Sequence, residues 1–569
     1  MISKTNNAGV PCVKVYALGG LDENGKNLYC IETLDAIFVI EAGSKYPDIS
    51  NPGVDIVIPD FSYLEQNKKK VKAVIISHGH DDVYGALPFL LKKIGFEVPI
   101  YTTQTAKAII EHDYGSRYKN FNFRIIKPSD DVMIFGYPFH FFATSHAVME
   151  SFGFSVETQA GNIVYTGNYI SDFGAKGHFA MDFPKIAKIS EEKNTLLMLC
   201  ESTASEKPGI ASPTHKITPH IKNIIEEGEK RVFISVYNQN LYVIQEIIQL
   251  VIANNKKLVI TDDKFLNILP QFISNGDLII PRANQCGIND ISNYPSKDIV
   301  VLITGSGEEI FKTIISLARE ESKLSPYLRI NPDDAFVMAC PPAPSIETLA
   351  TEAEDELYKT NCEVIFLNRK DISSMHAQQE DIKMMISIFH PKYYMPIQGE
   401  FRLMMANAKI AEGLGYQTGN IFLLDNGMSL AFDRAGNAIN PFQLFKPGST
   451  FIDGLGVGDV KTNIIEERNA MASSGAIIIT SYYSSSQNKV IGDTKLVIKG
   501  LVDIKESATV TKQIKHFVDQ LLERILNEKP DNIEALKNKT IDNMSNDIKK
   551  ITSKTPLIIL NVFDVDKEN

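Results

Sequence analysis

The chain has 569 residues, of which 44% are hydrophobic and 22% are charged, and its formal net charge is −11. This composition excludes extended disorder, and the acidic balance excludes a protein that is basic throughout. We find no apolar run near the roughly 20 residues of a membrane helix and no apolar signal core at the start. We therefore expect a soluble, cytoplasmic protein with no membrane partner. Six scattered cysteines without a CxxC pair fit a reducing compartment.

The first part of the chain alternates short apolar runs with glycine-rich turns, which is typical of β-strands. A buried type of strand, residues 71–77, leads into a polar segment and then into a helix expected at 84–93. The pattern predicts a β-rich layer flanked by helices. Its other expected strands are 13–17, 28–32, 36–41, 139–144, 153–157 and 163–166.

From about residue 205, strands and helices alternate, which predicts an inserted α/β domain with a parallel sheet. Strands expected at 231–236, 257–261 and 298–304 are interleaved with helices at 241–253 and 308–320. Beyond residue 362 we expect strands at 363–367 and 393–397. A last unit begins near residue 447, with an amphipathic helix over 514–525 whose apolar face we assign to a core, and a final strand at 557–562.

The strongest chemical signal is the segment from His78 to Asp82. Two histidines at positions i and i+2, directly after a buried strand, can direct their imidazoles at one cation. The carboxylate of Asp82 can reach the same cation or a second one beside it. Imidazole and carboxylate ligands suit zinc or manganese. The alternative is a polar loop with two solvated histidines.

The stretch from Val54 to Asp82 resembles the metal-binding region of the metallo-β-lactamase superfamily and, more narrowly, the ribonuclease J family of the β-CASP group. The resemblance is closest to that family's degenerate second-paralogue branch. It spans nearly the whole chain, with matching segments in the same order. These are ALGGLDENGKN, SHAVMESFG, TGNYISDF, CESTASE, SSMHAQQE, MPIQGEFR and IDGLGVGDV.

The resemblance implies an α/β fold built on an αββα metallo-β-lactamase sandwich that is made from two segments of the chain. It also implies an inserted β-CASP domain and a small C-terminal α/β domain, which supports oligomer formation in the family. The expected boundaries are 1–205 and 365–446 for the sandwich, 206–364 for the β-CASP domain, 447–455 for a linker and 456–569 for the C-terminal domain.

The family pattern implies two metal ions that share one carboxylate. The first site keeps its histidines, His78, His80 and His146. The second keeps only Asp82, because the other ligand positions carry Val83, Asn168 and Gln398. Two neighbouring dications repel strongly, and a shared carboxylate offsets much of that repulsion. We therefore expect at most one zinc or manganese ion per chain. The alternative is that the histidines are vestigial and hydrogen-bonded among themselves.

The resemblance also implies RNA contacts. The family motif H-x-S-G-H, which grips the 5′-phosphate, reads here Ile372, Ser373, Ser374, Met375 and His376. The Ser374 and His376 positions match and are suitable donors to phosphate. Ile372 cannot donate, and Met375 replaces a glycine where close backbone approach matters. The alternative is a polar loop between a strand and a helix.

Two further positions match the family. Glu201 matches an acidic motif residue, either as an orienter of a catalytic loop or as a plain carboxylate at a strand end. Asn240 matches a nucleotide contact, although Gln239 beside it departs from the family pattern.

Three functions follow from these residues. The first is a degenerate ribonuclease J-type subunit that binds RNA and pairs with an active paralogue, with a homodimer or tetramer as a further option. The second is a slow one-metal 5′→3′ exoribonuclease and endoribonuclease, with Asp82 as base or orienter and His376 as proton donor. The third is a structural scaffold without RNA affinity. Val83, Asn168 and Gln398 favour the first over the second.

Overall fold

A computed structural model of the chain describes residues 9–47, 51–115, 120–226, 228–454, 462–501, 504–528 and 533–566. The last residue of the expected linker, and the beginning of the expected C-terminal domain up to residue 461, lie outside these ranges. The chain forms two compact units. Unit 1 comprises residues 1–46 and 57–450, and unit 2 comprises residues 47–56 and 451–569. Unit 1 in turn contains a two-sheet lobe, here called the core lobe, and an inserted lobe with one parallel sheet.

The core lobe contains an eight-stranded and a six-stranded sheet. In spatial order the first consists of β20 (Ala438–Gln443), β19 (Met428–Phe432), β1 (Val13–Gly19), β2 (Leu28–Glu32), β3 (Ile37–Ile40), β5 (Val71–Ile75), β6 (Ile100–Thr102) and β7 (Phe123–Ile125). The second consists of β18 (Tyr393–Ile397), β12 (Thr195–Glu201), β11 (Asn162–Tyr165), β10 (Phe152–Glu157), β9 (Tyr137–Ala143) and β8 (Asp131–Ile134).

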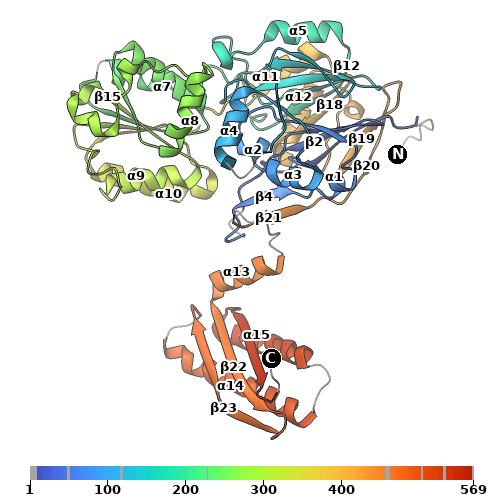
Figure 1. Cartoon of the computed structure of the whole chain (residues 1–569), viewed down its shortest axis with the longest axis vertical. Helices are drawn as coiled ribbons and strands as arrows, with labels where there is room; N and C mark the ends of the chain where they lie inside the picture. The colour runs from blue at the N-terminus through green and yellow to red at the C-terminus, as the bar shows by residue number, and fades with distance from the viewer. Residues whose placement is uncertain are drawn as a thin grey trace. The chain divides into compact units, whose positions relative to one another are not determined.

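The two sheets pack face to face on an aromatic core. The rings of Phe38 on β3 and Phe139 on β9 lie 5.1 Å apart, and both side chains are fully buried. The outer face of the second sheet buries apolar side chains of α5 (Phe183–Glu192) and α11 (Gln379–Phe389), and α12 (Phe401–Gly413) packs on β18. Figure 1 shows these helices along β12 and β18. The expected αββα sandwich is confirmed.

The helices before β9 are short, and one differs from its prediction. The core lobe also has α1 (Ser62–Gln66), α2 (Asp81–Tyr84), α3 (Leu87–Ile94) and α4 (Gln104–Tyr114). The single helix expected at 84–93 is divided between α2 and α3. Gly85 lies so close to the Ser44 hydroxyl that a Cβ there would clash, and α3 starts again with Pro88 in its first turn.

The inserted lobe contains five parallel strands, which confirms the parallel sheet predicted from the alternation. Their order is β14 (Lys257–Ile260), β15 (Ile299–Gly305), β13 (Val232–Tyr237), β16 (Ala335–Met338) and β17 (Glu363–Phe366). One face buries α6 (Thr218–Glu226), α7 (Leu241–Ala253) and α8 (Asp263–Ser274), and the other buries α9 (Gly307–Ala318) and α10 (Glu347–Lys359). Strand β17 pairs with β16, so the chain after Cys362 adds an edge to this sheet before it returns to the core lobe.

Unit 2 contains a three-stranded sheet in the order β23 (Lys489–Lys499), β22 (Ala476–Ser484) and β24 (Leu557–Asp564). Helices α14 (Ile504–Glu528) and α15 (Ile533–Thr552) pack on it, and α13 (Thr462–Ser474) precedes it. The apolar stripe of α14 is buried against β22 and β24, so its assignment to a core is confirmed. The remaining short strands are β4 (Ile56–Pro59) and β21 (Ser449–Ile452). Among the described helices, none is long and apolar enough to cross a membrane.

Candidate metal centre

Three histidines from two loops meet at one end of the core lobe. His78 and His80 lie between β5 and α2, and His146 lies between β9 and β10. His78 Nε2 lies 3.2 Å from His80 Nδ1, which in turn lies 3.3 Å from His146 Nε2. The ligand atoms of the three rings all lie within 4.8 Å of one another, so the group can hold a metal ion. The structure therefore brings together the three histidines singled out in the sequence.

In each ring, one nitrogen points away from the other histidines (the outer nitrogen) and one points toward them (the inner nitrogen). The hydrogen bond of the outer nitrogen determines whether the inner nitrogen carries a proton or a lone pair. His80 Nε2 contacts the Gln239 carbonyl at 3.1 Å, and His146 Nδ1 contacts the Met375 carbonyl at 2.7 Å. Because a carbonyl can only accept, both outer nitrogens carry the proton. In neutral rings, His80 Nδ1 and His146 Nε2 then face each other as two lone pairs, 3.3 Å apart. Such an arrangement suits a cation bound between them, and each metal-binding histidine usually has an outer partner of this kind.

The alternative, in which the histidines only bond one another, requires a charged ring for the His80–His146 contact, whereas a neutral His78 can donate from Nε2 to His80 Nδ1 at 3.2 Å. A hydrogen bond between His80 and His146 needs an additional proton on one of them, because both outer nitrogens already donate. Burial lowers the pKa of His80 and lowers those of His78 and His146 well below the ordinary value, so a charged ring is disfavoured. His78 Nδ1 lies 2.9 Å from the Ser77 hydroxyl. When this hydroxyl accepts the Nδ1 proton, the lone pair of His78 Nε2 is directed at the centre. The donor set therefore fits one metal ion with three nitrogen ligands.

The positions that the sequence resemblance assigns to a second metal site lack such a donor set. The Asp82 carboxylate accepts from Asn27 Nδ2 at 2.9 Å, and burial raises its pKa. Val83 is a buried apolar residue of α2, and both amide atoms of buried Asn168 lack a partner among the described residues. Gln398 has a left-handed backbone with φ of +56°. The described residues contain no second group of three histidine, cysteine or acidic side chains close enough to hold an ion.

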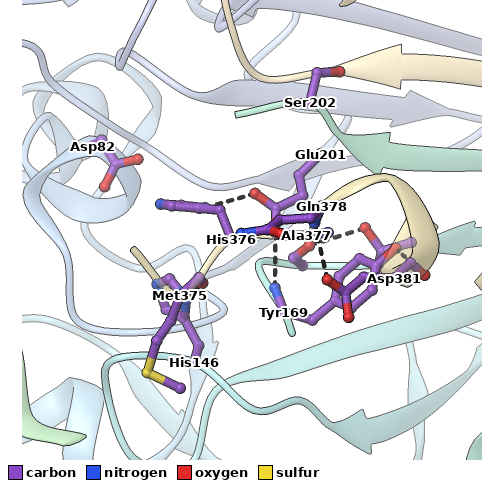
Figure 2. Close-up of polar contacts among 12 residues, drawn as sticks. Asp82, His146, Tyr169, Glu201, Ser202, Met375, His376, Ala377, Gln378 and Asp381 are labelled. Carbon is purple, nitrogen blue, oxygen red and sulfur yellow. Dashed lines mark hydrogen bonds and ion pairs between the residues drawn. The ribbon is translucent and has the colours of Figure 1, made fainter. Parts of the chain in front are cut away.

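A partly exposed histidine, His376, and a buried glutamate, Glu201, form a pair beside His146 (Figure 2). His376 Nδ1 lies 2.6 Å from Glu201 Oε2, and the other oxygen of Glu201 accepts from the backbone N–H groups of Tyr169 and Ala377. Burial alone would lower the pKa of His376, but the charge and hydrogen bond of Glu201 raise it above its ordinary value. In Figure 2 the ring of His376 extends from Glu201 toward Asp82. The pair therefore holds a proton close to the metal centre.

In the expected phosphate-binding segment, some side chains are buried and others are accessible to a ligand. Ile372 and Met375 are buried in the core of the inserted lobe, and Ser373 donates its backbone N–H to Thr214. Ser374 is exposed, and His376 is partly exposed, so these two remain available to a ligand.

Asn240, expected to contact a nucleotide, also has a structural role. Its side chain accepts from the Val243 N–H at 3.3 Å and caps the N-terminus of α7. The sequence left two roles open for Glu201, and only the structure pairs it with His376. The one local signal for that pairing is a carboxylate at the end of a buried strand.

Three family models match consecutive parts of the chain. The ribonuclease J β-CASP domain matches residues 229–357, the Zn-dependent metallo-hydrolase RNA specificity domain matches 363–421, and the ribonuclease J C-terminal domain matches 463–565. The chain belongs to the ribonuclease J family. Ribonuclease J 2 of Staphylococcus saprophyticus is 29% identical over 555 residues, which is 96% of this chain and 97% of that protein. Ribonuclease J 2 of Staphylococcus aureus is 28% identical over 549 residues, with the same coverage of both chains.

Solved structures support the fold of this ribonuclease J family member. A protein of unknown function from Enterococcus faecalis is similar, with a TM-score of 0.50 and 14% identity, over 74% of this chain and all of that chain. At this identity the likeness concerns the fold alone. The inserted lobe carries the β-CASP match, and we use that name for it below.

Proposed function

We propose that this chain is an RNA-binding subunit with a one-metal centre and weak or no hydrolysis of its own, which works beside an active ribonuclease J paralogue. The observation that carries the proposal is the contrast between the two sites. Two buried histidines and one partly buried histidine face one another within the reach of one ion, whereas Val83, Asn168 and Gln398 offer the second site neither charge nor imidazole. A lone dication needs no bridging carboxylate, but a pair does.

The metal ligands in this proposal are His78 Nε2, His80 Nδ1 and His146 Nε2. Zinc or manganese is the expected ion. Three imidazole nitrogens suit zinc, and manganese would need oxygen ligands in addition. When bound, the ion would supply Lewis acidity and would lower the pKa of a coordinated water. The chain's own contribution is to fix the three ring orientations through Ser77, Gln239 and Met375.

The RNA-facing side of the proposal rests on Ser374 and His376. An exposed hydroxyl and an imidazole whose pKa is raised by Glu201 are suitable donors to a terminal phosphate. This arrangement favours RNA binding over the scaffold hypothesis, which gives those side chains no role. Asn240 would contribute through its backbone and position rather than through a free side chain, because that side chain caps α7.

A second candidate function is a slow one-metal exoribonuclease and endoribonuclease. The His376–Glu201 pair favours it. His376 Nδ1 donates to Glu201 Oε2 at 2.6 Å, and because Glu201 raises the pKa of His376, the proton on Nε2 is available to a leaving oxygen. Asp82 would then orient water or accept a proton.

One experiment separates these functions. The full-length protein is dialysed, its metal content is measured by elemental analysis, and it is assayed on 5′-monophosphorylated RNA beside His78→Ala. We expect RNA binding, at most one metal equivalent that His78→Ala removes, and little hydrolysis. Two tightly held equivalents would refute the one-metal centre. If the protein hydrolyses RNA and His78→Ala abolishes this hydrolysis, the one-metal enzyme takes the place of the subunit as the proposed function.

A further inference from the structure

A turn of the β-CASP lobe reaches across to the loop that carries two of the three histidines. The turn connects β13 to α7, and Gln239 is the residue of this turn that contacts the loop of His78 and His80. The Gln239 carbonyl accepts from His80 Nε2 at 3.1 Å, and its side-chain Nε2 donates to Asp81 Oδ2 at 2.8 Å. The main chain and the side chain of Gln239 therefore hydrogen-bond to two consecutive residues of the metal-binding loop, His80 and Asp81.

The start of α7, directly after this turn, contacts the loop of the third histidine. The Tyr242 N–H donates to the Ala147 carbonyl at 3.0 Å, directly after His146. Within the β-CASP lobe, the turn is anchored by the Asn238 N–H, which donates to the Gly305 carbonyl at 3.1 Å. The anchored turn and the helix that follows it thus contact both loops of the metal centre.

The Gln239 carbonyl sets the chemistry of His80. Because it can only accept, it holds the proton on Nε2 and leaves the lone pair of Nδ1 directed at the centre. The backbone of a turn can shift by tenths of an ångström, so the carbonyl stays in place only if the residue is held. The hydrogen bond from the Gln239 side chain to Asp81, which directly follows His80, keeps the Gln239 carbonyl in place.

We propose that Gln239 is a positioning residue, which uses its hydrogen bond to Asp81 to hold its own carbonyl against His80 and thereby raises the affinity of the three-histidine centre for one metal ion. The inference rests on the proposed one-metal centre. It has a reciprocal consequence, because a contact that strengthens metal binding is itself strengthened by the metal. Metal binding therefore stabilises the docking of the β-CASP turn on the core lobe.

Removing the Gln239 side chain should leave the protein folded. Asp81 keeps a second partner, since the Tyr46 hydroxyl donates to the same oxygen at 3.2 Å, and both Asp81 and Gln239 are only partly buried. No buried group is therefore left unpaired by Gln239→Ala. A change in metal affinity can then be separated from a loss of structure.

The test uses the full-length protein, freed of metal by a chelator and titrated with Co²⁺ alone, with calorimetry and the visible absorption of bound cobalt as readouts. We expect the parent to bind one equivalent and Gln239→Ala to bind up to about 10-fold more weakly, since an outer partner of a ligand is typically worth 10–100-fold and the carbonyl remains but is held less firmly. Gln271→Ala is the matched control, because this β-CASP glutamine of α8 bonds Asn275, the residue directly after its own helix. Its affinity should equal that of the parent.

Two Asp81 variants test the partner. Asp81→Asn keeps an oxygen that accepts from Gln239 and should retain most of the affinity, whereas Asp81→Ala should lose as much as Gln239→Ala. The double variant Gln239→Ala/Asp81→Ala should be no weaker than either alone, because both changes remove one hydrogen bond. Additive losses, or parent-like affinity of Gln239→Ala, would overturn the role of Gln239 and leave the metal centre standing. A parent that binds no Co²⁺ would overturn both.

Discussion

At the scale of single residues, the proposed one-metal centre rests on the difference between two sets of positions. The first keeps three imidazoles whose outer nitrogens are occupied by Ser77, Gln239 and Met375. At the second, the side chain of Asn168 is 2% exposed and both its amide atoms lack partners among the described residues. A neutral amide cannot offset the repulsion between two dications. The loss of charge at this position therefore matters more than the loss of any one donor.

We predict that hydrolysis returns only when the second site is restored as a unit. Val83→His and Gln398→His return donors without charge, and Asn168→Asp returns charge without donors. Each single variant should gain little, and the triple variant should gain zinc- or manganese-dependent RNA hydrolysis, because such groups act non-additively. Single-turnover assays across the four variants and the parent test this. A parent already as fast as the triple variant would contradict it.

Asp381 joins segments that lie far apart in the chain. Its carboxylate is fully buried and accepts from the N–H groups of Ser171, Ala211 and Gln378 at 2.9–3.0 Å. The last of these bonds belongs to the capping box at the start of α11, directly after the loop of His376 (Figure 2). Asp381 therefore positions the His376 loop against two other loops of unit 1.

We predict that Asp381→Ala lowers the free energy of unfolding by about 3 kcal/mol or more, because each buried N–H left unpaired costs about 1–3 kcal/mol. Asp381→Asn should cost less, since one oxygen remains. Glu380→Ala is the control. The Glu380 carboxylate is exposed and, among the described residues, pairs with Lys383, so a loss of about 0.5 kcal/mol is expected. Urea unfolding measures all three. Equal losses for Asp381→Ala and Glu380→Ala would argue against this role.

At the scale of elements, a buried cluster joins the loop after β11 to the start of the β-CASP lobe. The Asp172 carboxylate accepts from the hydroxyls of Ser212 and Tyr242 and lies 3.2 Å from His215 Nε2. The His215 side chain is fully buried, and burial lowers its pKa to about 4 although Asp172 opposes the shift. His215 is therefore neutral in the folded protein at neutral pH.

The neutral state of His215 predicts a pH dependence of stability. Its pKa is about 4 in the folded state and about 6.5 when unfolded, so the unfolded chain binds the proton first as the pH falls. Between pH 6.5 and 4 this histidine should remove about 3 kcal/mol of stability. His215→Gln should flatten that part of the curve, whereas His390→Gln, at an exposed site, serves as the control. Parallel curves for His215→Gln and the parent would contradict the assignment.

At the scale of the whole molecule, unit 2 exposes an apolar row on the sheet face opposite its helices. Ile478 on β22 pairs with Val497 on β23 and with Ile559 on β24, and these side chains are 40%, 46% and 40% exposed. The rings of Tyr482 on β22 and Phe563 on β24 stack farther along these two strands. A contiguous exposed row of this kind is typical of protein–protein interfaces.

We predict that this row contributes to self-association or to pairing with an active paralogue. Ile478→Glu combined with Ile559→Glu should lower the mass measured by light scattering and the recovery of the paralogue in co-purification, because two buried charges would face an apolar interface. Leu34→Glu, at an exposed apolar position of unit 1, should change neither. A parent that is monomeric and ignores the paralogue would refute the prediction.

The sequence by itself determined the features that depend on near neighbours. Alternating apolar residues predicted most strands, the β–α alternation predicted the parallel sheet, and the spacing of His78 and His80 predicted two ligands of one cation. These patterns are local, because strand and helix periodicity and the reach of two side chains two residues apart are set within a few residues. The break between α2 and α3 escaped the prediction, because the Ala86 N–H donates to the carbonyl of distant Ala42 rather than within a helix.

Only the tertiary structure decided the contacts that define the site's chemistry. His376 and Glu201 are 175 residues apart in the chain, His80 and Gln239 are 159 apart, and Asp381 and Ser171 are 210 apart. No local pattern encodes such pairs, since each requires two lobes or several loops to pack before the hydrogen bond can form. The state of each imidazole, and with it the choice between a metal centre and a polar cluster, depends on these distant carbonyl and carboxylate groups.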